Sequence, residues 1–254
     1  MDNFRLDGCR AVVTGGGRGI GAGLAKGLAD AGADLVLVAR SQSQLEKTRD
    51  EILRTGRDVG IVAADLSRKE EIDGMFDELV SHHGPVDILV NNAGTTRRAP
   101  AHELDLEDWQ AVIDVNLTAA FAMCRAFARH RIAAGEGGRI VNVGSLMSST
   151  TRRDNAPYAS SKGGILLLTK ALAVDWAEYR ILVNAIGPGF IKTPLTEPLS
   201  KDPDFDRWVK ERCPLGRWGS PGDLAGAVIF LASPAANFVT GQILYVDGGW
   251  LARF

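Results

Sequence analysis

Two kinds of apolar pattern alternate along the whole chain. Short runs rich in Val, Ile or Leu have the length of a strand, and such continuous apolar runs are typical of strands covered on both faces. Longer segments between them carry apolar residues at helical spacing. The predicted strands are residues 11–14, 35–39, 60–63, 87–90, 139–143, 182–186 and 243–246. The predicted helices are residues 20–31, 43–54, 69–82, 106–134, 158–179 and 221–231.

This strict alternation of strand and helix predicts an α/β fold. We expect a Rossmann-like, doubly wound sheet of seven parallel strands, flanked by helices on both faces. No tandem repeat or low-complexity linker divides the sequence, so residues 1–254 are predicted to form a single domain. Residues 190–219 interrupt the alternation with Pro-rich, aromatic sequence and a short predicted helix at 205–212. Because this segment follows the carboxyl end of a predicted strand, we expect it to cover a ligand.

Composition and charge narrow the function classes. The chain is 45% hydrophobic and 24% charged, with a net charge of -2 and dispersed basic residues, so no nucleic-acid partner is predicted. Cys9, Cys124 and Cys213 lie far apart, which fits a reducing compartment better than a disulfide framework or a zinc site. The histidines include no i,i+4 pair, and no metal site is predicted. Without a signal-like N-terminus or an apolar run that we judge long enough to span a bilayer, we expect a cytoplasmic protein with no membrane partner.

A glycine-rich segment connects the first predicted strand to the first predicted helix. It reads Thr14-Gly15-Gly16-Gly17-Arg18-Gly19-Ile20-Gly21. Glycines allow the backbone to approach a pyrophosphate closely, and the N-terminus of the following helix attracts its negative charge. Because strand, turn and helix follow one another in this order, we predict a dinucleotide-binding site. The predicted contacts are Gly15, Gly17, Arg18, Gly19, Ile20 and Gly21.

The end of the second predicted strand bears on the choice of cofactor. A carboxylate about 20 residues beyond the glycines would bind the ribose 2′-hydroxyl of NAD. Arg40 and Ser41 stand there instead, and Asp34 lies at the opposite end of the strand. Arg40 and Arg18 can hold the 2′-phosphate of NADP through charge-assisted hydrogen bonds, although each could also be a solvated surface residue. NADP (NADPH) is therefore predicted as the cofactor in preference to NAD.

Tyr158 and Lys162 form a candidate acid–base pair. They lie four residues apart on a predicted helix, so their side chains share one face. A free phenol titrates near pKa ~10, and a neighbouring ammonium favours the phenolate, so we expect Lys162 to lower the pKa of Tyr158. The same spacing also fits a buried Tyr and a snorkelling Lys on an ordinary amphipathic helix. Ser145, which ends a predicted strand just upstream, and the glycine-rich turn favour the catalytic interpretation.

With these features together, the chain resembles the short-chain dehydrogenase/reductase family along nearly its whole length. The matching segments are residues 14–21, 65–66, 91–94, 116, 145, 158–162, 187–189, 191 and 193. The resemblance implies that Tyr158 exchanges a proton with the substrate oxygen and that Ser145 hydrogen-bonds the same oxygen. It implies that Lys162 also holds the nicotinamide ribose. It further implies that Asn116 kinks a long helix and holds a water that relays protons through Lys162.

The resemblance also implies the remaining cofactor contacts. Asp65 and Leu66 would lie against the adenine. The segment from Asn92 through Ala93 to Gly94 would lie against the adenosine ribose. At the nicotinamide end the implied contacts are Tyr158, Lys162, Pro188, Gly189, Ile191 and Thr193.

Arginines near the expected active site indicate an acidic substrate. Arg97 and Arg98 follow the fourth predicted strand, and the loop between Ser145 and Tyr158 contains Arg152-Arg153-Asp154. With residues 216–219 and the tail 246–254, they resemble the sugar-acid dehydrogenases of the family. A guanidinium can hold a carboxylate in two-point contact and fix which carbinol meets the nicotinamide. The predicted substrate contacts are Arg98, Ser145, Arg153 and Tyr158.

The expected reaction is reversible hydride transfer between the nicotinamide and C5 of a sugar acid, gluconate to 5-ketogluconate. An equally supported alternative is that these arginines form ion pairs with acids of the chain, such as Glu103 or Asp154. Rival functions are the oxidation of 2-dehydro-3-deoxy-D-gluconate at C5, the reduction of 3-oxoacyl groups on an acyl carrier protein, and dinucleotide sensing by a regulator. The resemblance also leads us to expect a homotetramer that uses the helices 106–134 and 158–179 and the C-terminal strand.

Overall fold

A parallel sheet lies at the centre of the computed structural model, which describes residues 2–253. Within that range the sheet has seven strands in the order β3-β2-β1-β4-β5-β6-β7. The strands are β1 (Arg10–Thr14), β2 (Asp34–Ala39), β3 (Val59–Ala63), β4 (Ile88–Asn91), β5 (Gly138–Val143), β6 (Ile181–Pro188) and β7 (Ile243–Val246). Each coincides with a predicted strand to within two residues, so the predicted α/β fold class is confirmed. Strands β2 and β3 lie on one side of β1, and strands β4 to β7 lie on the other. The strand order therefore reverses between β1 and β4, which is where doubly wound sheets bind ligands.

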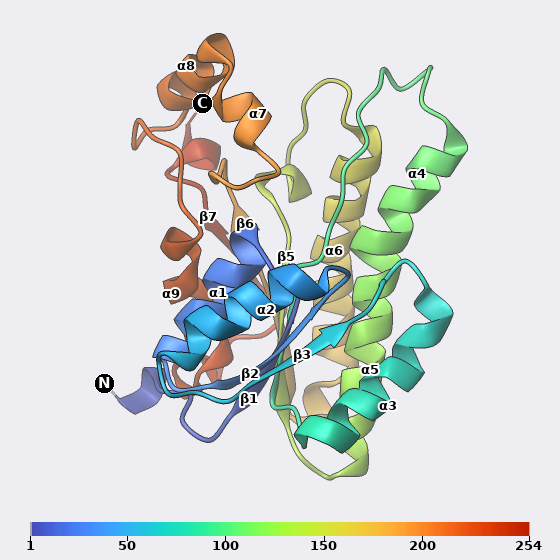
Figure 1. The fold of residues 1–254 in the computed structure, drawn as a ribbon. Coiled ribbons are helices and arrows are strands. Elements are labelled where there is room, and N and C mark those ends of the chain that lie inside the picture. Colours follow the sequence, from blue (N-terminus) through green and yellow to red (C-terminus); the bar gives the residue numbers. More distant parts are fainter. Residues whose placement is uncertain (1, 254) are drawn as a thin grey trace.

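Helices cover both faces of the sheet (Figure 1). On one face lie α1 (Gly19–Asp30), α2 (Gln42–Leu53) and α9 (Gly222–Ala232), and on the other lie α3 (Ile72–His83), α5 (Ala119–Ala133) and α6 (Ala156–Asp175). Successive residues of β1 alternate between the two cores, because Ala11 and Val13 pack toward α1 while Val12 packs toward α3 and α5. Burial on both faces explains why the strands are apolar at nearly every position.

One long helical segment corrects a sequence-based expectation. It comprises α4 (Leu106–Ile113), a π-helical segment (Asp114–Thr118) and α5. In the described part of the chain it is the one helix, Leu106–Ala133, long and apolar enough to cross a membrane, with a mean hydropathy of 1.4 over its most apolar window. The expectation that no apolar run reaches that length was therefore wrong. Of that window 56% is buried, and α5 packs against α3, β4 and β5, as a core helix does.

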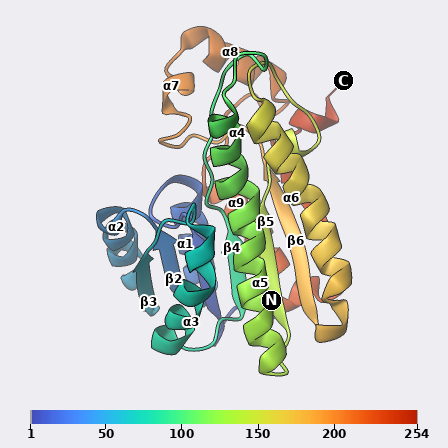
Figure 2. The same cartoon turned by 90° about the vertical axis from the view of Figure 1, so that its right-hand side faces the viewer.

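The segment after β6 rises beyond the carboxyl ends of the strands (Figure 2). It contains α7 (Glu197–Ser200) and α8 (Pro203–Arg212). The Asp202 side chain accepts hydrogen bonds from the backbone N–H groups of Asp204 and Phe205 at 3.0 and 3.2 Å, and proline follows it at the first helical position. Both features are strong signals for a helix start. The predicted helix at 205–212 is confirmed and begins two residues earlier, whereas α7 was not predicted.

Five aromatic side chains hold α8 in place. Phe190 after β6 lies 5.6 Å from Trp218 and 4.8 Å from Trp250, measured between ring centres. Phe205 and Trp208 of α8 each lie 5.7 Å from Phe190. Edge-to-face and tilted ring pairs at these distances are favourable. We call Phe190, Phe205, Trp208, Trp218 and Trp250 the aromatic cluster.

Candidate active site

The glycine-rich turn leaves β1 and enters α1 with very little space around it. Gly15 has a positive φ of 65°, and a Cβ added to Gly21 would lie 2.2 Å from the Gly15 carbonyl oxygen. Only glycine therefore fits either position without rearrangement. The helix α1 begins at Gly19, so its N-terminal N–H groups open onto the turn. Such a cradle fits a pyrophosphate, which needs close backbone approach and the positive end of a helix.

The end of β4 is tied to this turn through Asn92. The Asn92 amide donates hydrogen bonds to the carbonyl oxygens of Thr14 and Gly15 at 2.9 and 3.3 Å. The Thr14 hydroxyl accepts from the backbone N–H groups of Asn92 and Ala93 at 2.9 and 3.0 Å. Gly94 follows as an exposed residue. The structure thus brings the predicted residues 92–94 beside the glycine turn, at the point where the strand order reverses.

The tip of β2 is cationic. Arg40 directly follows β2, and both Arg40 and Arg18 are exposed and form no ion pair with any residue from 2 to 253. Ser41 is the N-cap residue of α2. Asp34 lies at the other end of β2, where its carboxylate accepts the Asp58 backbone N–H at 3.0 Å. The arrangement fits a phosphate group at the strand tip and offers no carboxylate of β2 to a ribose hydroxyl.

Asp65 and Leu66 lie one strand further out, just after β3. Leu66 is buried, whereas Asp65 is exposed. The Ser67 backbone N–H holds the pKa of the Asp65 carboxyl below its usual range, with a smaller contribution from the positive charge of Arg40. Arg40 and Asp65 are therefore close enough to interact, although no ion pair joins them.

The predicted acid–base residues converge at the carboxyl end of β5. Ser145 caps a short 3-10 turn (Leu146–Ser148), and its hydroxyl accepts the Met147 backbone N–H at 3.1 Å. From α6 the buried Lys162 Nζ donates to the Val143 carbonyl at 2.6 Å and lies 5.7 Å from the Tyr158 ring centre. Burial lowers the pKa of Lys162 to about 8.

The electrostatics of Tyr158 differ from the sequence-based expectation. Burial raises the pKa of Tyr158. A hydrogen bond from Ser145 and, to a smaller extent, the positive charge of Arg98 lower this pKa and oppose the effect of burial. Lys162 is not among the groups that lower it. The physical reason is that Lys162 is directed to the Val143 carbonyl and its own positive charge is disfavoured by burial. The phenol therefore stays protonated at neutral pH.

Asn116 lies in the π-helical segment between α4 and α5 and is buried. Its amide donates to the Thr95 carbonyl and the Ser161 hydroxyl, both at 3.0 Å, and its carbonyl accepts the Thr95 N–H at 2.8 Å. Such π-helical turns inside α-helices are frequent at functional sites. The side chain thus joins the loop after β4 to the helix that carries Tyr158. Sequence reasoning did not identify Thr95 and Ser161 as its partners, since neither is marked by any spacing.

The segment after β6 reaches back to the glycine turn. Pro188 ends β6, the Gly189 N–H donates to the Val246 carbonyl at 3.0 Å, and Ile191 pairs with Gly219 in a short bridge. A Cβ added to Gly19 would lie 3.5 Å from the Thr193 Cβ. The segment 188–193 therefore connects the end of β6 to the glycine turn and forms one wall of the site, while Tyr158 and Lys162 come from α6.

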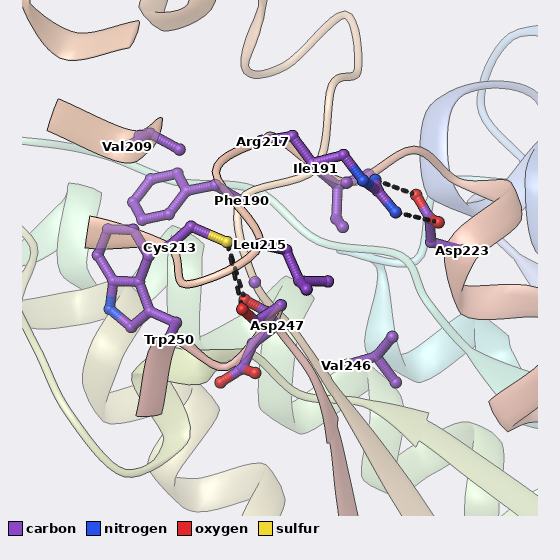
Figure 3. A pocket seen from close by; sticks show the side chains of 13 residues that line it. Phe190, Ile191, Val209, Cys213, Leu215, Arg217, Asp223, Val246, Asp247 and Trp250 are labelled. Atoms are coloured by element: carbon purple, nitrogen blue, oxygen red, sulfur yellow. Dashed lines mark hydrogen bonds and ion pairs between the residues drawn. The ribbon is translucent and has the colours of Figure 1, made fainter. Parts of the chain in front are cut away.

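A cavity of about 150 Å³ lies behind this wall (Figure 3). The Cys213 thiol faces the carbonyl oxygens of Asp247 and Gly248, and the Arg217–Asp223 ion pair closes the other side at 2.9 Å. The other lining residues are Gly189, Phe190, Ile191, Val209, Leu215, Gly219, Val246 and Trp250. The cysteines Cys9, Cys124 and Cys213 are all free. Within residues 2–253, no group of three His, Cys, Asp or Glu side chains could hold a metal ion.

The arginines expected at the substrate end have different surroundings. Arg97 forms an ion pair with Asp108, with Nε 3.1 Å from the carboxylate. For this residue the ion-pair alternative therefore holds, with Asp108 as the partner in place of the expected Glu103 or Asp154. Arg98 is exposed, makes no ion pair in the described part of the chain, and lies close enough to lower the pKa of Tyr158. Arg153 is exposed, while Arg152 is partly buried.

Known proteins resemble this chain over its full length. The family model described as enoyl-(acyl carrier protein) reductase matches residues 15–251. The gluconate 5-dehydrogenase of Gluconobacter oxydans (strain 621H) is 41% identical over 98% of this chain and 96% of its own length. The 2-dehydro-3-deoxy-D-gluconate 5-dehydrogenase of Escherichia coli (strain K12) is also 41% identical, over 100% of this chain and 99% of its own.

The chain belongs to the short-chain dehydrogenase/reductase family. The resemblance inferred from its motifs is thereby confirmed, and with it the class of NAD(P)-dependent oxidoreductases. A solved family member, the gluconate 5-dehydrogenase of Burkholderia cenocepacia J2315 in complex with NADP and tartrate, is 43% identical. Its structure matches with a TM-score of 0.95 over 100% of this chain and 99% of that chain.

Proposed function

We propose that the protein is an NADP-dependent gluconate 5-dehydrogenase that interconverts gluconate and 5-ketogluconate. The observation that carries the proposal is the unpaired Arg98 beside the Tyr158 phenol, a cation next to an acid–base group in a family of dehydrogenases. Support comes from the 41% identity to the Gluconobacter oxydans gluconate 5-dehydrogenase. Further support comes from the related enzyme whose crystals contain NADP and tartrate, a hydroxy acid.

In the direction of reduction, NADPH supplies the hydride that forms the new C–H bond at C5. Tyr158 donates its phenolic proton to the C5 oxygen, and its raised pKa keeps that proton in place at neutral pH. Ser145 donates a hydrogen bond to the same oxygen and stabilises its developing negative charge. The hydrogen bond of Ser145 and the positive charge of Arg98 stabilise the phenolate that remains. Lys162 would hold the nicotinamide ribose, and Asn116 fixes the helix that carries Tyr158 and Lys162 through Ser161. Oxidation follows the same steps in reverse.

We propose that NADP lies along the carboxyl edge of the strands. Gly15, Gly17, Gly19, Ile20 and Gly21 would hold the pyrophosphate, and Arg18, Arg40 and Ser41 the 2′-phosphate. Asp65 and Leu66 would contact the adenine and Asn92, Ala93 and Gly94 the adenosine ribose. Pro188, Gly189, Ile191 and Thr193 would face the nicotinamide, with Tyr158 and Lys162 at its ribose. The positive β2 tip supports NADP over NAD.

A second function has its own support. The 2-dehydro-3-deoxy-D-gluconate 5-dehydrogenase of Escherichia coli is 41% identical, the same value as for the gluconate enzyme. Gluconate and 2-dehydro-3-deoxy-D-gluconate both have a carboxylate and a C5 carbinol, so both would use Arg98 and Tyr158 in the same way. We prefer gluconate because a solved gluconate 5-dehydrogenase, 43% identical to this chain, is in complex with NADP and tartrate, a hydroxy acid.

A substrate panel tests the proposal. Initial rates are measured with 5-ketogluconate, oxidised 2-dehydro-3-deoxy-D-gluconate and an acetoacetyl thioester, each with NADPH and NADH. We expect the highest kcat/KM for 5-ketogluconate with NADPH. Preference for the thioester would move the assignment to 3-oxoacyl-carrier reduction, and cofactor binding without turnover would indicate a regulator.

The assembly and location remain predictions. We infer a homotetramer of single-domain chains in the cytoplasm. Within the long helices expected at the interface, Val112, Phe127 and Ile165 are buried inside the chain and are not available to an interface. The long helices nevertheless leave Phe121, Leu167 and Val174 at 41%, 67% and 79% exposure, and such patches are typical of association surfaces. Light scattering should return about 109 kDa, four times the 27.2 kDa chain, and a value near one chain would contradict the assembly.

A further inference from the structure

Arg152 has an unusual environment for an arginine in a surface loop. It lies between the turn that follows Ser145 and the start of α6. Its guanidinium carbon lies 5.3 Å from the centre of the Phe205 ring on α8. Its Nε is buried and has no hydrogen-bond partner among the residues that the structure describes. Buried donors without a partner are rare in folded proteins, so this one indicates that a group from outside the chain completes the site.

A second arginine approaches Arg152 from a different loop. Burial lowers the pKa of Arg152, and the positive charge of Arg98 lowers it further against the opposing effect of Asp154. Neither Arg98 nor Arg152 makes an ion pair with any residue from 2 to 253. By contrast, the nearby Arg97 and Arg217 each pair with an aspartate. Two unpaired cations held close together destabilise the protein unless an anion lies between them.

Arg152 and Arg153 lie just before a left-handed turn and have different surroundings. Asp154 has a positive φ of 60°, in the left-handed region that aspartate tolerates better than most residues. The chain turns there before α6 begins at Ala156. Arg152 packs against Phe205, whereas Arg153 is exposed and has no hydrogen bond or ion pair in the described range. We therefore place Arg152 at the substrate in place of the sequence-predicted Arg153.

We propose that Arg98 and Arg152 together bind the carboxylate of the substrate, and that Arg152 transmits its binding to α8 through Phe205. The proposal rests on the proposed function, since it assigns the carboxylate of the sugar acid to two named residues. Planar guanidinium groups are suited to binding a carboxylate, because each can offer it two parallel N–H donors. Arg98 also borders Tyr158, so a carboxylate held by the pair would fix which carbinol reaches the phenol.

The aromatic cluster makes the coupling to α8 measurable. Phe205 lies 5.2 Å from Trp208 and 6.3 Å from Trp218, measured between ring centres. A ligand that draws Arg152 toward its carboxylate changes the position of the cation over Phe205 and hence the surroundings of both indoles. Tryptophan fluorescence therefore reports on sugar-acid binding directly, without any turnover.

The first experiment compares Arg152→Ala with Arg153→Ala, which removes the same charge from the exposed neighbour. Initial rates are measured with NADPH and 5-ketogluconate, and unfolding temperature and NADPH affinity are checked for both variants. We expect Arg152→Ala to lower kcat/KM by roughly 10–100-fold, chiefly through KM, and Arg153→Ala by less than about 3-fold. Arg152→Lys should lie between them, because it keeps the charge and loses the planar fork.

An equal loss in Arg152→Ala and Arg153→Ala, or a larger loss in Arg153→Ala, would overturn the proposal while leaving the gluconate activity of the wild type intact. Absence of wild-type turnover with any keto-hexonate would instead contradict the proposed function. The two failures are therefore distinguishable.

The second experiment titrates the NADPH-loaded protein with gluconate and follows tryptophan fluorescence. Gluconate and NADPH are both reduced, so they bind without reacting. We expect a saturable change in the wild type that weakens roughly 10–100-fold in affinity in Arg152→Ala. In Phe205→Leu, gluconate should still bind, as shown by calorimetry, but with less than about half of the fluorescence change, because the cation no longer contacts a ring. A full change in Phe205→Leu would refute the coupling to α8.

Discussion

Replacement of Lys162 by methionine is expected to stabilise the folded protein at neutral pH. Lys162 is almost completely buried and its ammonium makes one hydrogen bond, to the Val143 carbonyl at 2.6 Å. Burial lowers its pKa from 10.5 to about 8, so at pH 7 the folded chain keeps a charge that its surroundings disfavour. Methionine has a similar length and no charge, and it suits an apolar pocket.

The size of the effect follows from the pKa shift. A lowering from 10.5 to about 8 corresponds to roughly 3 kcal/mol at about 1.4 kcal/mol per pH unit. Loss of the hydrogen bond to Val143 offsets about 1 kcal/mol of this gain. The net increase in the free energy of unfolding is therefore about 2 kcal/mol, or a rise of roughly 4–8 °C in Tm for a chain of this length.

The pH dependence gives a second test. Below pH 8 the lysine is protonated in both the folded and unfolded states, and its full burial cost is present. Between about 8 and 10.5 the folded state has released the proton while the unfolded state keeps it, so wild-type stability rises with pH relative to the variant. The difference in the free energy of unfolding between Lys162→Met and the wild type should therefore become smaller across that pH range.

Urea unfolding at one protein concentration, without cofactor, measures both effects. Lys170→Met, an exposed lysine on the same helix, is the matched control and should change the stability by less than about 0.5 kcal/mol. The reasoning would be refuted if Lys162→Met were no more stable than the wild type at pH 7. It would also be refuted if the difference in the free energy of unfolding stayed constant up to pH 10.5.

Three further changes test the cofactor and catalytic sites. Tyr158→Phe should preserve the unfolding temperature and NADPH affinity and lower kcat by roughly 100- to 10,000-fold, and retention of more than about a tenth of kcat would exclude Tyr158 as the acid. Arg40→Ala should raise KM for NADPH by roughly 10–100-fold and leave KM for NADH nearly unchanged, with equal effects marking Arg40 as a surface residue. Gly21→Ala should weaken NADPH binding and lower Tm, because the new Cβ would lie 2.2 Å from the Gly15 carbonyl oxygen, and normal NADPH affinity would show that the turn can move.

The sheet and its helices were predictable because burial on both faces leaves a clear record in the sequence. The central strands bury apolar residues toward two cores, so each appears as an apolar run bounded by turns. The π-helical segment Asp114–Thr118 was not predictable, since one extra residue in a helical turn barely changes the apolar spacing. The four-residue α7 is too short and too exposed to show any periodicity.

The candidate site was predictable where a motif needs particular residue types at a fixed spacing, as in the glycine turn and the pair Tyr158 and Lys162. Local electrostatics were not, because the pKa of Tyr158 depends on burial and on Arg98, which lies 60 positions away in sequence. The difference between Arg152 and Arg153 depends on the packing of Arg152 against Phe205 of α8, a tertiary contact that two consecutive arginines do not reveal.

Four unpaired arginines near the carboxyl edge form two groups that we assign to two ligands. Arg18 and Arg40 lie at the β2 tip. Arg98 acts on both Tyr158 and Arg152, and none of the four has an ion-pair partner within residues 2–253. Each group should therefore be stabilised by its own anion, and a ligand at about 100 times its Kd adds roughly 2.7 kcal/mol to the free energy of unfolding. In thermal unfolding, Arg40→Ala should remove most of the shift caused by NADPH and little of the further shift caused by gluconate, which cannot react with the reduced cofactor. Arg152→Ala should do the reverse. If either variant diminished both shifts equally, the two groups would form a single electrostatic site, and the assignment of one anion to each would be wrong.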